Sequence, residues 1–385
     1  MSNAGTIQRL DDGTFRLWAS AGSADGKRVR LSERFNGSYR DAQRRLAALR
    51  ADVDSGRYIA RRKGTLAGFV EAWWPSKAAS IAPTSARGYR QALDSYILPS
   101  LGPRDLQKLT GAEISTMLGQ LTGRGKFRSA EATYIVLKIV LNAAIKQGAL
   151  ARSPLAGVEK PKVARRELTV LTPADWQRVK AHLEERESWA LRPLTVALTS
   201  GVRRSELSGL QWRDVDFDKG ILHVRRAYHV LKGGPGFYRE PKSERSRRAI
   251  ALDAGTIDTL RAQRVDAGRT AAMFGRKVAD TDPVFARADN TPWPPDTFSG
   301  AWQRIAKRLG LDVRLHDLRH TSATLLLGAN VPVQLVSQRL GHASAGFTLS
   351  TYAHVLPGAA TEAAEKLAAL LNGPRRGPVP ALPAA

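Results

Sequence analysis

Arg203 and Glu206 form the first of several patterns in this sequence that suit the binding of an anion. They lie in the stretch Thr199–Leu207, with Arg203 two positions after a glycine. Three residues apart on a helix, the two side chains share one face. A guanidinium presents a fork of donors that matches phosphate oxygens, and a glutamate one turn away can hold it in place. A solvent-exposed ion pair has the same spacing, so this motif gains meaning only from the others.

A lysine on a turn is the second candidate. Lys242 lies in the basic segment Glu240–Arg248, between Ile221–Arg225 and Ala249–Leu252, whose compositions are typical of short strands. We therefore expect a small antiparallel sheet with a basic turn. Turn lysines are most often only solvated, and on local evidence alone that interpretation is favoured.

Histidine and arginine occur together in Leu315–Thr321. His316 and Arg319 are three residues apart, so a helix places them on one face. His320 is adjacent to Arg319 and is expected to point elsewhere. Because arginine is not a metal ligand, an imidazole beside a guanidinium favours a phosphate over a metal ion.

The last motifs bring further histidines close to a tyrosine. Gln338–His342 ends in Leu-Gly-His, and ten residues after His342 the sequence reads Thr351-Tyr352-Ala353-His354. Four of the seven histidines thus fall between positions 316 and 354. A single histidine is more often a packed or capping residue, but the joint pattern favours a functional role.

The overall charge indicates a polyanionic partner. Lys and Arg number 60 against 35 Asp and Glu, which gives a net charge of +25. Such an excess repels itself unless an anion offsets it. Nucleic acid is the first interpretation, and an anionic membrane surface is the second. No run of 18 or more apolar residues occurs, which excludes an ordinary transmembrane helix.

Cysteine is absent. Disulfides, thiolate zinc sites and cysteine nucleophiles are therefore excluded. The first residues also lack the apolar core of a secretory signal. These features predict a reducing, cytoplasmic location.

The elements that must position these motifs begin with a small basic unit in residues 1–63. Thr14–Trp18 alternates polar and apolar side chains, Lys27–Leu31 can be the returning strand, and Tyr39–Ser55 has helical apolar spacing. Fourteen Lys and Arg against seven Asp and Glu give this unit a net charge of +7. The charge suits either a solvated basic ribbon or a sheet that lies in a DNA groove.

Residues 64–150 have the pattern of about four helices. Thr110 and Glu113 fit a capping box, in which each side chain satisfies a free amide group near the other. Residues 151–167 are basic and interrupted by prolines, which is typical of a linker. Residues 372–385 hold four prolines and two glycines, so they are expected to be disordered.

Taken together, the motifs resemble those of the tyrosine recombinases, specifically the phage-type integrases of the DNA breaking–rejoining fold. Arginine box, β-turn lysine, His-x-x-Arg, Leu-Gly-His and Thr-Tyr-Ala-His occur in the family's order and spacing, most clearly over residues 170–365. The resemblance extends over nearly the whole chain. Ser205 is a departure, because many relatives carry glycine there, but it leaves Arg203 and Glu206 in place.

The resemblance implies a multidomain protein. In chain order its parts are a small α+β arm-type DNA-binding domain with a three-stranded sheet plus helix (1–63), an all-α core-binding domain of the SAM-like type (64–150), a basic linker (151–167), a mainly α catalytic domain with a small antiparallel sheet (168–371) and a disordered tail (372–385). In such relatives a segment like the one over 361–371 docks on a neighbouring subunit and controls activity.

The resemblance also implies a reaction. Tyr352 is expected to attack a DNA backbone phosphate, forming a 3′-phosphotyrosyl link and freeing a 5′-hydroxyl, without ATP, a cofactor or a metal ion. A tyrosine hydroxyl with a pKa of about 10 is mostly un-ionised at pH 7 and needs a base. The other expected roles are phosphate neutralisation by Arg203 and Arg319, base catalysis by His316, proton donation to the leaving oxygen by Lys242, a hydrogen bond to the phosphate from His342, and support of these side chains by Glu206 and Asp317.

Three other tyrosines compete with Tyr352 for the role of nucleophile. Tyr228 and Tyr238 lie on the proposed sheet near Lys242, and Tyr134 lies on an apolar helix face. None of them has the downstream position or the Thr-x-Ala-His surroundings, so Tyr352 is the expected nucleophile.

Double-stranded DNA with core-type and arm-type attachment sites is the expected partner. Because each cut strand needs its own nucleophile, the resemblance implies a homotetramer on DNA, a monomer in solution, and assistance from an accessory excision factor. The basic side chains expected to contact DNA are Arg16, Lys27, Arg28, Arg30, Lys160, Lys162, Arg165, Arg166, Arg245 and Arg247.

Two other functions share part of this evidence. A type IB topoisomerase uses the same chemistry, but the separate N-terminal unit argues against it. A non-catalytic helix-turn-helix-like DNA-binding protein is the other alternative, because residues 324–339 have the pattern of helix, turn and helix. Such a protein has no need of the arginine, lysine, histidine and tyrosine set. The expected function is therefore a site-specific DNA recombinase, or integrase, that integrates and excises a mobile element.

Overall fold

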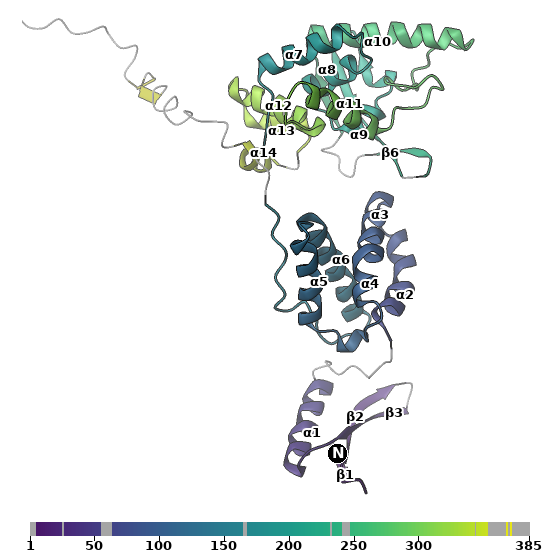
Figure 1. Cartoon of the computed structure of the whole chain (residues 1–385), viewed down its shortest axis with the longest axis vertical. Coiled ribbons are helices and arrows are strands. Elements are labelled where there is room, and N and C mark those ends of the chain that lie inside the picture. Colours follow the sequence, from purple (N-terminus) through teal and green to yellow (C-terminus); the bar gives the residue numbers. More distant parts are fainter. Residues whose placement is uncertain are drawn as a thin grey trace, which may run out of the picture. The chain divides into compact units, whose positions relative to one another are not determined.

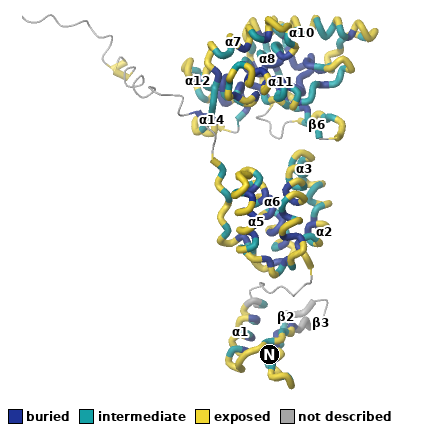
Figure 2. The backbone as a smooth tube through the Cα atoms, viewed as in Figure 1, coloured by how far each residue is buried: buried dark blue, intermediate teal, exposed yellow. Residues whose placement is uncertain are grey.

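The computed structural model divides into two compact units, Met1–Arg165 and Arg166–Ala385 (Figure 1). Buried positions gather inside each unit (Figure 2). The residues that the structure describes are 5–24, 27–54, 64–164, 168–231, 233–240, 247–342, 344–352, 367–368 and 370–371. Among them, no helix is long and apolar enough to cross a membrane.

The first part of the N-terminal unit is a three-stranded antiparallel sheet packed on one helix. Phe15, Leu17 and Ala19 alternate with more exposed residues along the middle strand, so one face of the sheet is apolar. That face meets Leu46 and Leu49 of the helix. The strand order is β1-β2-β3, and the elements are β1 (Thr6–Arg9), β2 (Phe15–Ala24), β3 (Lys27–Phe35) and α1 (Tyr39–Asp54). The predicted three-stranded sheet plus helix is confirmed.

The central part of the same unit is helical, as predicted. Thr110 begins one helix with the expected capping box: its Oγ1 accepts the N–H of Glu113 at 3.3 Å, and Glu113 Oε2 accepts the N–H of Thr110 at 3.0 Å. Leu137 and Leu141 are buried in a core that all the long helices share. The elements are α2 (Leu66–Ala79), α3 (Pro83–Ala92), the π-helix η1 (Leu93–Ile97), α4 (Leu98–Leu101), the 3-10 helix η2 (Leu106–Lys108), α5 (Gly111–Gly123) and α6 (Phe127–Lys146).

The proline-punctuated segment after α6 begins against the central helices. Leu155 is buried in the central core, and Val158 packs on it. Lys160 forms an ion pair with Glu131 of α6 at 2.6 Å. The first part of this segment is therefore held by the central domain.

The second unit is mainly helical around one large apolar core, with Trp212, Phe298 and Trp302 buried in it. It carries a small antiparallel sheet of order β4-β5-β8, in which Leu222 pairs with Ile250, and a separate hairpin of β6 and β7. The predicted mainly α domain with a small antiparallel sheet is confirmed. Its elements are α7 (Pro173–Glu184), α8 (Leu191–Ser200), α9 (Arg204–Gly209), the 3-10 helix η3 (Trp212–Asp214), β4 (Val215–Asp216), β5 (Ile221–Val224), β6 (Ala227–Val230), β7 (Gly236–Arg239), β8 (Arg248–Ala251), α10 (Ala254–Met273), α11 (Pro295–Arg308), α12 (Leu315–Gly328), α13 (Val333–Leu340) and α14 (Ala345–Tyr352).

Helices α12, α13 and α14 enclose a smaller apolar cluster. Leu327, Val336 and Leu340 pack there with Tyr352, which ends α14. Helix α8 also packs on α12. The arginine, histidine and tyrosine motifs, far apart in the sequence, are therefore carried by helices that pack on one another.

Candidate active site

Arg203 owes its position to the turn between α8 and α9. Gly201 ends α8 with a φ of 67°, a left-handed conformation that favours glycine, and a β-carbon there would lie 2.7 Å from Leu340. Arg203 follows, just before α9. Its guanidinium donates to Glu206 Oε1 at 2.7 Å and to the carbonyl oxygen of Gly341 at 3.2 Å. Glu206 thus contacts Arg203, as their spacing predicts.

Glu206 also binds a second arginine that the sequence analysis missed. Arg248, at the start of β8, donates to both oxygens of the Glu206 carboxylate, at 2.8 and 3.2 Å, and to the carbonyl oxygen of Arg339 at 2.7 Å. Burial raises the pKa of Glu206, but Arg248 and Arg203 outweigh it and bring that pKa down to about 2. The sequence contained a signal for this residue. Side chains alternate between the two faces of a strand, so Arg248 lies on the same inward face of β8 as Ile250.

Arg319 on α12 is buried, and like Arg203 it contacts the backbone at the end of α13. Its guanidinium donates to the carbonyl oxygens of Gly201 at 2.7 Å and Leu340 at 2.5 Å. Burial, with the nearby charges of Arg203 and Arg248, lowers the pKa of Arg319 to about 9. These three guanidiniums outnumber the one carboxylate between them, so a bound phosphate would relieve their repulsion.

His342 lies directly after the turn that ends α13, where Gly341 has a φ of 64°. Its Nδ1 is 2.8 Å from Oγ1 of Thr348 in α14. Burial lowers the pKa of His342 to about 4, and the charges of Arg319 and Arg203 act in the same direction. The ring is therefore neutral at pH 7. When Thr348 donates to Nδ1, Nε2 carries the ring proton and is able to donate it to a phosphate.

Tyr352 completes the cluster from the end of α14. Its side chain is 1% exposed, and its Oη lies 2.6 Å from Nδ1 of His320. Burial raises the pKa of Tyr352 to about 12, while the charge of Arg319 acts in the opposite direction. The phenol is thus held inside the protein, within electrostatic reach of a buried arginine.

The expectation that His320 points elsewhere was wrong. On an α-helix, positions i, i+3 and i+4 lie on one face, so His316, Arg319 and His320 form a single stripe. The rings of His316 and His320 meet edge to face with their centroids 5.1 Å apart. Burial lowers the pKa of His316 to about 4, and the charges of His320 and Arg319 add to the effect.

Asp317 stabilises the start of α12. Its Oδ2 accepts the N–H of Arg314 at 2.8 Å, and its carbonyl oxygen accepts the hydroxyl of Thr321 at 2.9 Å. A carboxylate in the first turn also complements the positive end of the helix dipole. Asp317 therefore supports the helix that carries His316 and Arg319.

Several site residues expected from the sequence fall outside the described part of the chain, including the expected proton donor. They are Lys242, Arg245, Arg165 and Arg166, together with the side chains of Lys27, Arg28 and Arg30, whose backbone belongs to β3.

Four of the side chains expected to contact DNA are described. Arg16 is exposed on β2, and Lys162 is exposed after the central helices. Lys160 is engaged in its ion pair with α6. Arg247 forms an ion pair with Glu240 across the ends of β7 and β8.

The three competing tyrosines have other surroundings. Tyr134 donates its hydroxyl to the carbonyl oxygen of Val158 at 3.4 Å, within the first unit. Tyr228 and Tyr238 face each other across the β6–β7 hairpin, with ring centroids 5.2 Å apart. Of these four tyrosines, Tyr352 is the one whose hydroxyl contacts a histidine of α12, His320.

A basic cleft borders the cluster. Its volume is about 950 Å³, and it runs from His316 along α11 and the loop before α12. Arg204, Lys307 and Arg314 line it. Cations along a cleft that ends at the candidate site are suited to bind the anionic backbone of a nucleic acid.

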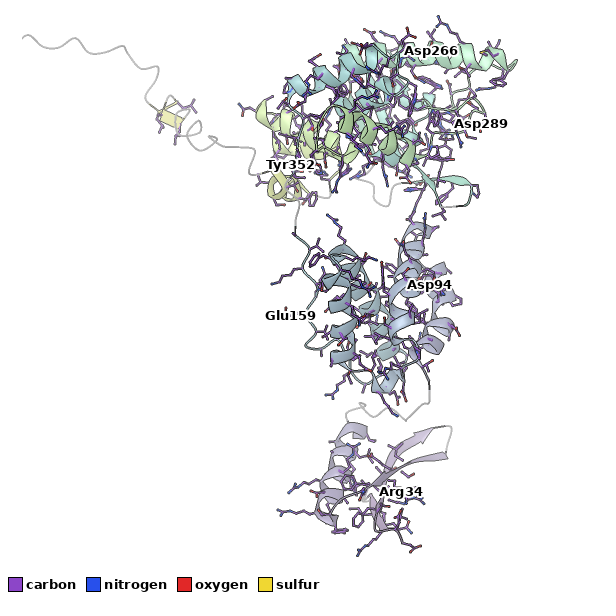
Figure 3. All side chains as sticks on the ribbon, in the orientation of Figure 1. Arg34, Asp94, Glu159, Asp266, Asp289 and Tyr352 are labelled. Atoms are coloured by element: carbon purple, nitrogen blue, oxygen red, sulfur yellow. The ribbon has the colours of Figure 1, made fainter. Side chains whose placement is uncertain are left out.

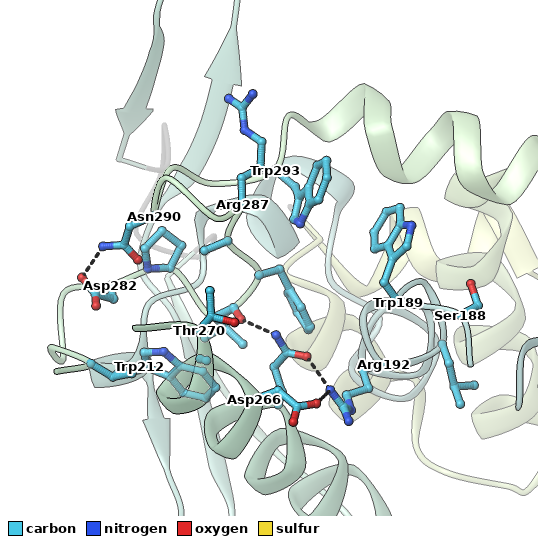
Figure 4. Close-up of a pocket in the computed structure, with 18 of the residues that line it drawn as sticks. Ser188, Trp189, Arg192, Trp212, Asp266, Thr270, Asp282, Arg287, Asn290 and Trp293 are labelled. Carbon is cyan, nitrogen blue, oxygen red and sulfur yellow. Dashed lines mark hydrogen bonds and ion pairs between the residues drawn. The ribbon is translucent and has the colours of Figure 1, made fainter. Parts of the chain in front are cut away.

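A second cavity, of about 740 Å³, lies between α10, the start of α8 and the loop before α11 (Figure 4). Trp189 stacks on Trp293 at 5.1 Å beside it, and Arg192 pairs with Asp266 at 2.6 Å. Figure 3 places Asp266 and Tyr352 on opposite sides of the second unit. This cavity is therefore separate from the cluster of arginines and histidines.

Comparison with solved structures identifies the fold. The Tn1549 transposon integrase in complex with transposon right end DNA superposes with a TM-score of 0.65 at 18% identity, covering 79% of this chain and 100% of that chain. The lambda integrase tetramer bound to a Holliday junction gives a TM-score of 0.59 at 19% identity, covering 90% of this chain and 94% of that chain. The architecture is that of DNA integrases.

Sequence comparison agrees. The ICEBs1 integrase of Bacillus subtilis (strain 168) is 23% identical over 370 residues, covering 95% of this chain and all of that protein. A XerC-like tyrosine recombinase of Caldanaerobacter subterraneus is 27% identical over 276 residues, covering 66% of this chain and 70% of that protein.

Two family models match successive stretches. The model of the phage integrase family matches residues 169–358, and the model of the phage integrase central domain matches residues 67–161. The chain belongs to the phage integrase family. It is a tyrosine-type site-specific recombinase, and neither the topoisomerase nor the repressor interpretation is favoured.

Proposed function

We propose that Tyr352 is the nucleophile with which this integrase cuts and rejoins double-stranded DNA, through a 3′-phosphotyrosyl link that serves to integrate and excise a mobile element. The observation that carries the proposal is the convergence of Arg203 and Arg319. They come from separate motifs, yet they donate to the neighbouring carbonyls of Gly341 and Leu340. A phosphate bound there gains charge-assisted hydrogen bonds from both forks.

The charge of the cluster suits the transition state of phosphoryl transfer. Negative charge spreads over the non-bridging phosphate oxygens as the phosphodiester is attacked. Guanidiniums already held in place stabilise that charge without reorganising. Burial lowers the pKa of Arg319 to about 9, which means that its charged form is destabilised. A bound phosphate would therefore stabilise the charged guanidinium strongly. His342, through Nε2, is proposed to add a further hydrogen bond.

Two proton transfers complete the proposed step. The departing 5′-oxygen takes a proton from Lys242, as expected from the sequence. The hydroxyl of Tyr352 gives its proton to a histidine of α12. His316, the base expected from the sequence, borders the basic cleft, whereas His320 contacts the hydroxyl itself. Glu206 and Asp317 are proposed to hold the arginines and α12 in place.

The proposed partner is double-stranded DNA with core-type and arm-type sites. The net charge of +25 supports this assignment. Residues 1–63 are proposed to bind the arm-type sites and residues 64–150 the core sites. In the structure of lambda integrase on a Holliday junction the protein is a tetramer. A homotetramer on DNA that is a monomer in solution, helped by an accessory excision factor, is proposed here as well.

The segment near the C-terminus is proposed to dock on a neighbouring subunit in that tetramer. Its described leucines, Leu367, Leu370 and Leu371, are exposed. Apolar side chains on one short helical segment are suited to a groove on another copy.

The test of the nucleophile is a suicide substrate, in which a nick traps the covalent intermediate. Tyr352→Phe removes only the attacking oxygen, so covalent adducts should disappear while binding to the same DNA persists. Tyr238→Phe is the matched control and should form adducts normally. A Tyr352→Phe protein that still forms adducts would refute the proposal.

Lys242 has its own test. Lys242→Ala should slow cleavage of ordinary DNA by about 10²–10⁴-fold, the usual contribution of a general acid. In a substrate with sulfur in place of the 5′-bridging oxygen, the leaving group is a thiolate, which needs no proton. This substrate should therefore restore the rate of cleavage by Lys242→Ala. Absence of that rescue would exclude Lys242 as the donor.

A further inference from the structure

The hydroxyl of Tyr352 contacts a histidine that lies outside the expected set. His320 Nδ1 and Tyr352 Oη are 2.6 Å apart, and the two rings have centroids 5.7 Å apart. Helix α12 delivers His320 to this place because it lies one turn after His316 and beside Arg319. No base is closer to the oxygen among the described hydrogen-bond partners of Tyr352.

We propose that His320 accepts the proton of Tyr352 when the phenol attacks DNA, and that His316 does not contact the nucleophile. The inference rests on Tyr352 being the nucleophile. A heavy-atom separation of 2.6 Å is within the range for direct proton transfer. The hydroxyl donates to Nδ1 when the ring proton is on Nε2, which leaves the lone pairs of Oη for the phosphorus.

The surroundings keep His320 ready to accept a proton. Burial lowers its pKa; Asp317 acts to raise it, and Arg319 to lower it further. His316 meets the ring edge to face. The ring is therefore neutral at pH 7. Burial raises the pKa of Tyr352 to about 12, so the phenol does not ionise by itself and needs a base in contact with it.

DNA binding strengthens this base. A phosphate that binds Arg319 offsets the positive charge that opposes protonation of His320. Proton acceptance thereby becomes easier when substrate is in place. Without DNA, the phenol stays protonated and buried against the ring.

The proposed step balances in both directions. The proton moves from Tyr352 Oη to His320 Nδ1 as the Oη–phosphorus bond forms. The bond from phosphorus to the 5′-oxygen breaks, and that oxygen leaves with a proton from Lys242. In rejoining, a 5′-hydroxyl attacks the phosphotyrosine and passes its proton to the now neutral Lys242, the bond from phosphorus to Tyr352 Oη breaks, and His320 returns its proton to the departing phenol oxygen.

Two substitutions of His320 separate its two roles, which are to hold the hydroxyl of Tyr352 in place and to accept its proton. His320→Asn places an amide near Nδ1 that keeps a hydrogen bond to Tyr352 but accepts no proton. His320→Leu removes both functions. His316→Asn tests the neighbouring ring, and His182→Asn on α7 is a control outside the cluster. Each variant is first checked for its unfolding midpoint and its DNA affinity.

The measurement is the single-turnover rate of adduct formation on a suicide substrate between pH 5.5 and 9. His320→Asn should be slower than wild type by about 10²-fold or more, the usual contribution of a general base, and should lose the rise of rate that follows histidine deprotonation. His316→Asn should retain that rise, and His182→Asn should match wild type. A His320→Asn protein with the wild-type rate and pH profile would overturn the proposal.

Rejoining offers an independent readout. A DNA strand that ends in a 3′-p-nitrophenyl phosphate loses its leaving group as an anion and needs no proton. In a Tyr352→Phe background no phenol can displace the p-nitrophenolate first, so joining of this strand to a 5′-hydroxyl should be as fast with the His320→Asn substitution added as without it. If His320→Asn slows this joining reaction as much as it slows adduct formation, the histidine supports the structure of the site instead of transferring a proton.

Failure of this inference is distinguishable from failure of the proposed nucleophile. If Tyr352→Phe still forms adducts, the nucleophile is wrong whatever His320 does. If Tyr352→Phe forms none and His320→Asn is unimpaired, Tyr352 stands and His320 is excluded as its base.

Discussion

Arg248 and Glu206 form an ion pair whose side chains are only 3% and 7% exposed. The guanidinium donates to both carboxylate oxygens, and the same carboxylate accepts from Arg203. One buried anion therefore orients two cations. Because Arg248 begins β8, it also fastens the small sheet to the turn that presents Arg203.

Removing Arg248 should destabilise the second unit strongly. Arg248→Met leaves Glu206 buried with less compensation, and breaking a buried pair in this way removes about 3–5 kcal/mol of stability. Urea denaturation measures the free energy of unfolding. Arg261→Met breaks an exposed pair with Asp258 on α10 and should change that energy by less than about 1 kcal/mol. Equal effects of the two substitutions would contradict the role of Arg248.

The pH dependence of stability should carry a contribution from Glu206. Its pKa is about 2 in the folded protein against an ordinary value of 4.5. Since the folded pKa is lowered, the carboxylate contributes stability that is complete above about pH 4.5 and is lost as the pH falls towards 2. The contribution is on the order of 3 kcal/mol.

Glu206→Gln does not titrate and isolates this contribution. The free energy of unfolding of wild type should fall more steeply than that of Glu206→Gln between pH 4.5 and the acid limit of the measurement. Two parallel curves over that range would show that Glu206 keeps an ordinary pKa.

Gly201 should resist substitution for two separable reasons. Alanine at a positive φ is strained by about 1–2 kcal/mol, and at this place its β-carbon also meets Leu340 at 2.7 Å. Gly275→Ala is the matched control, because it has a φ of 66° and no described atom within 4 Å of its β-carbon position. Gly201→Ala should be the more destabilising in thermal unfolding and should slow cleavage, since Arg319 donates to the Gly201 carbonyl. Equal midpoints for the two variants would exclude the contact with Leu340.

Local sequence patterns predicted much of the fold because they depend on neighbours in the chain. The capping box of Thr110 and Glu113 and the alternation of Phe15 and Leu17 are examples. The first strand, Thr6–Arg9, came from the family resemblance and not from its own pattern. It buries almost none of its side chains, so it carries little apolar signal.

The site was harder to predict in its details. Arg203 and Arg319 donate to backbone carbonyls. Because every residue has a carbonyl, the residue types in the sequence do not show which one an arginine contacts. The role of Arg248 required the register of β8. The place of His320, in contrast, was predictable from its i,i+4 spacing to His316. It was missed because His320 was compared only with the adjacent Arg319.

Tyr352 is proposed to attack a phosphate held by Arg203 and Arg319. The most direct test is to trap wild-type protein on a suicide DNA substrate, digest the complex and locate the attached nucleotide by mass spectrometry. A phosphodiester link on Tyr352 is the expected result. A nucleotide attached to Tyr228, Tyr238 or any other residue would contradict it.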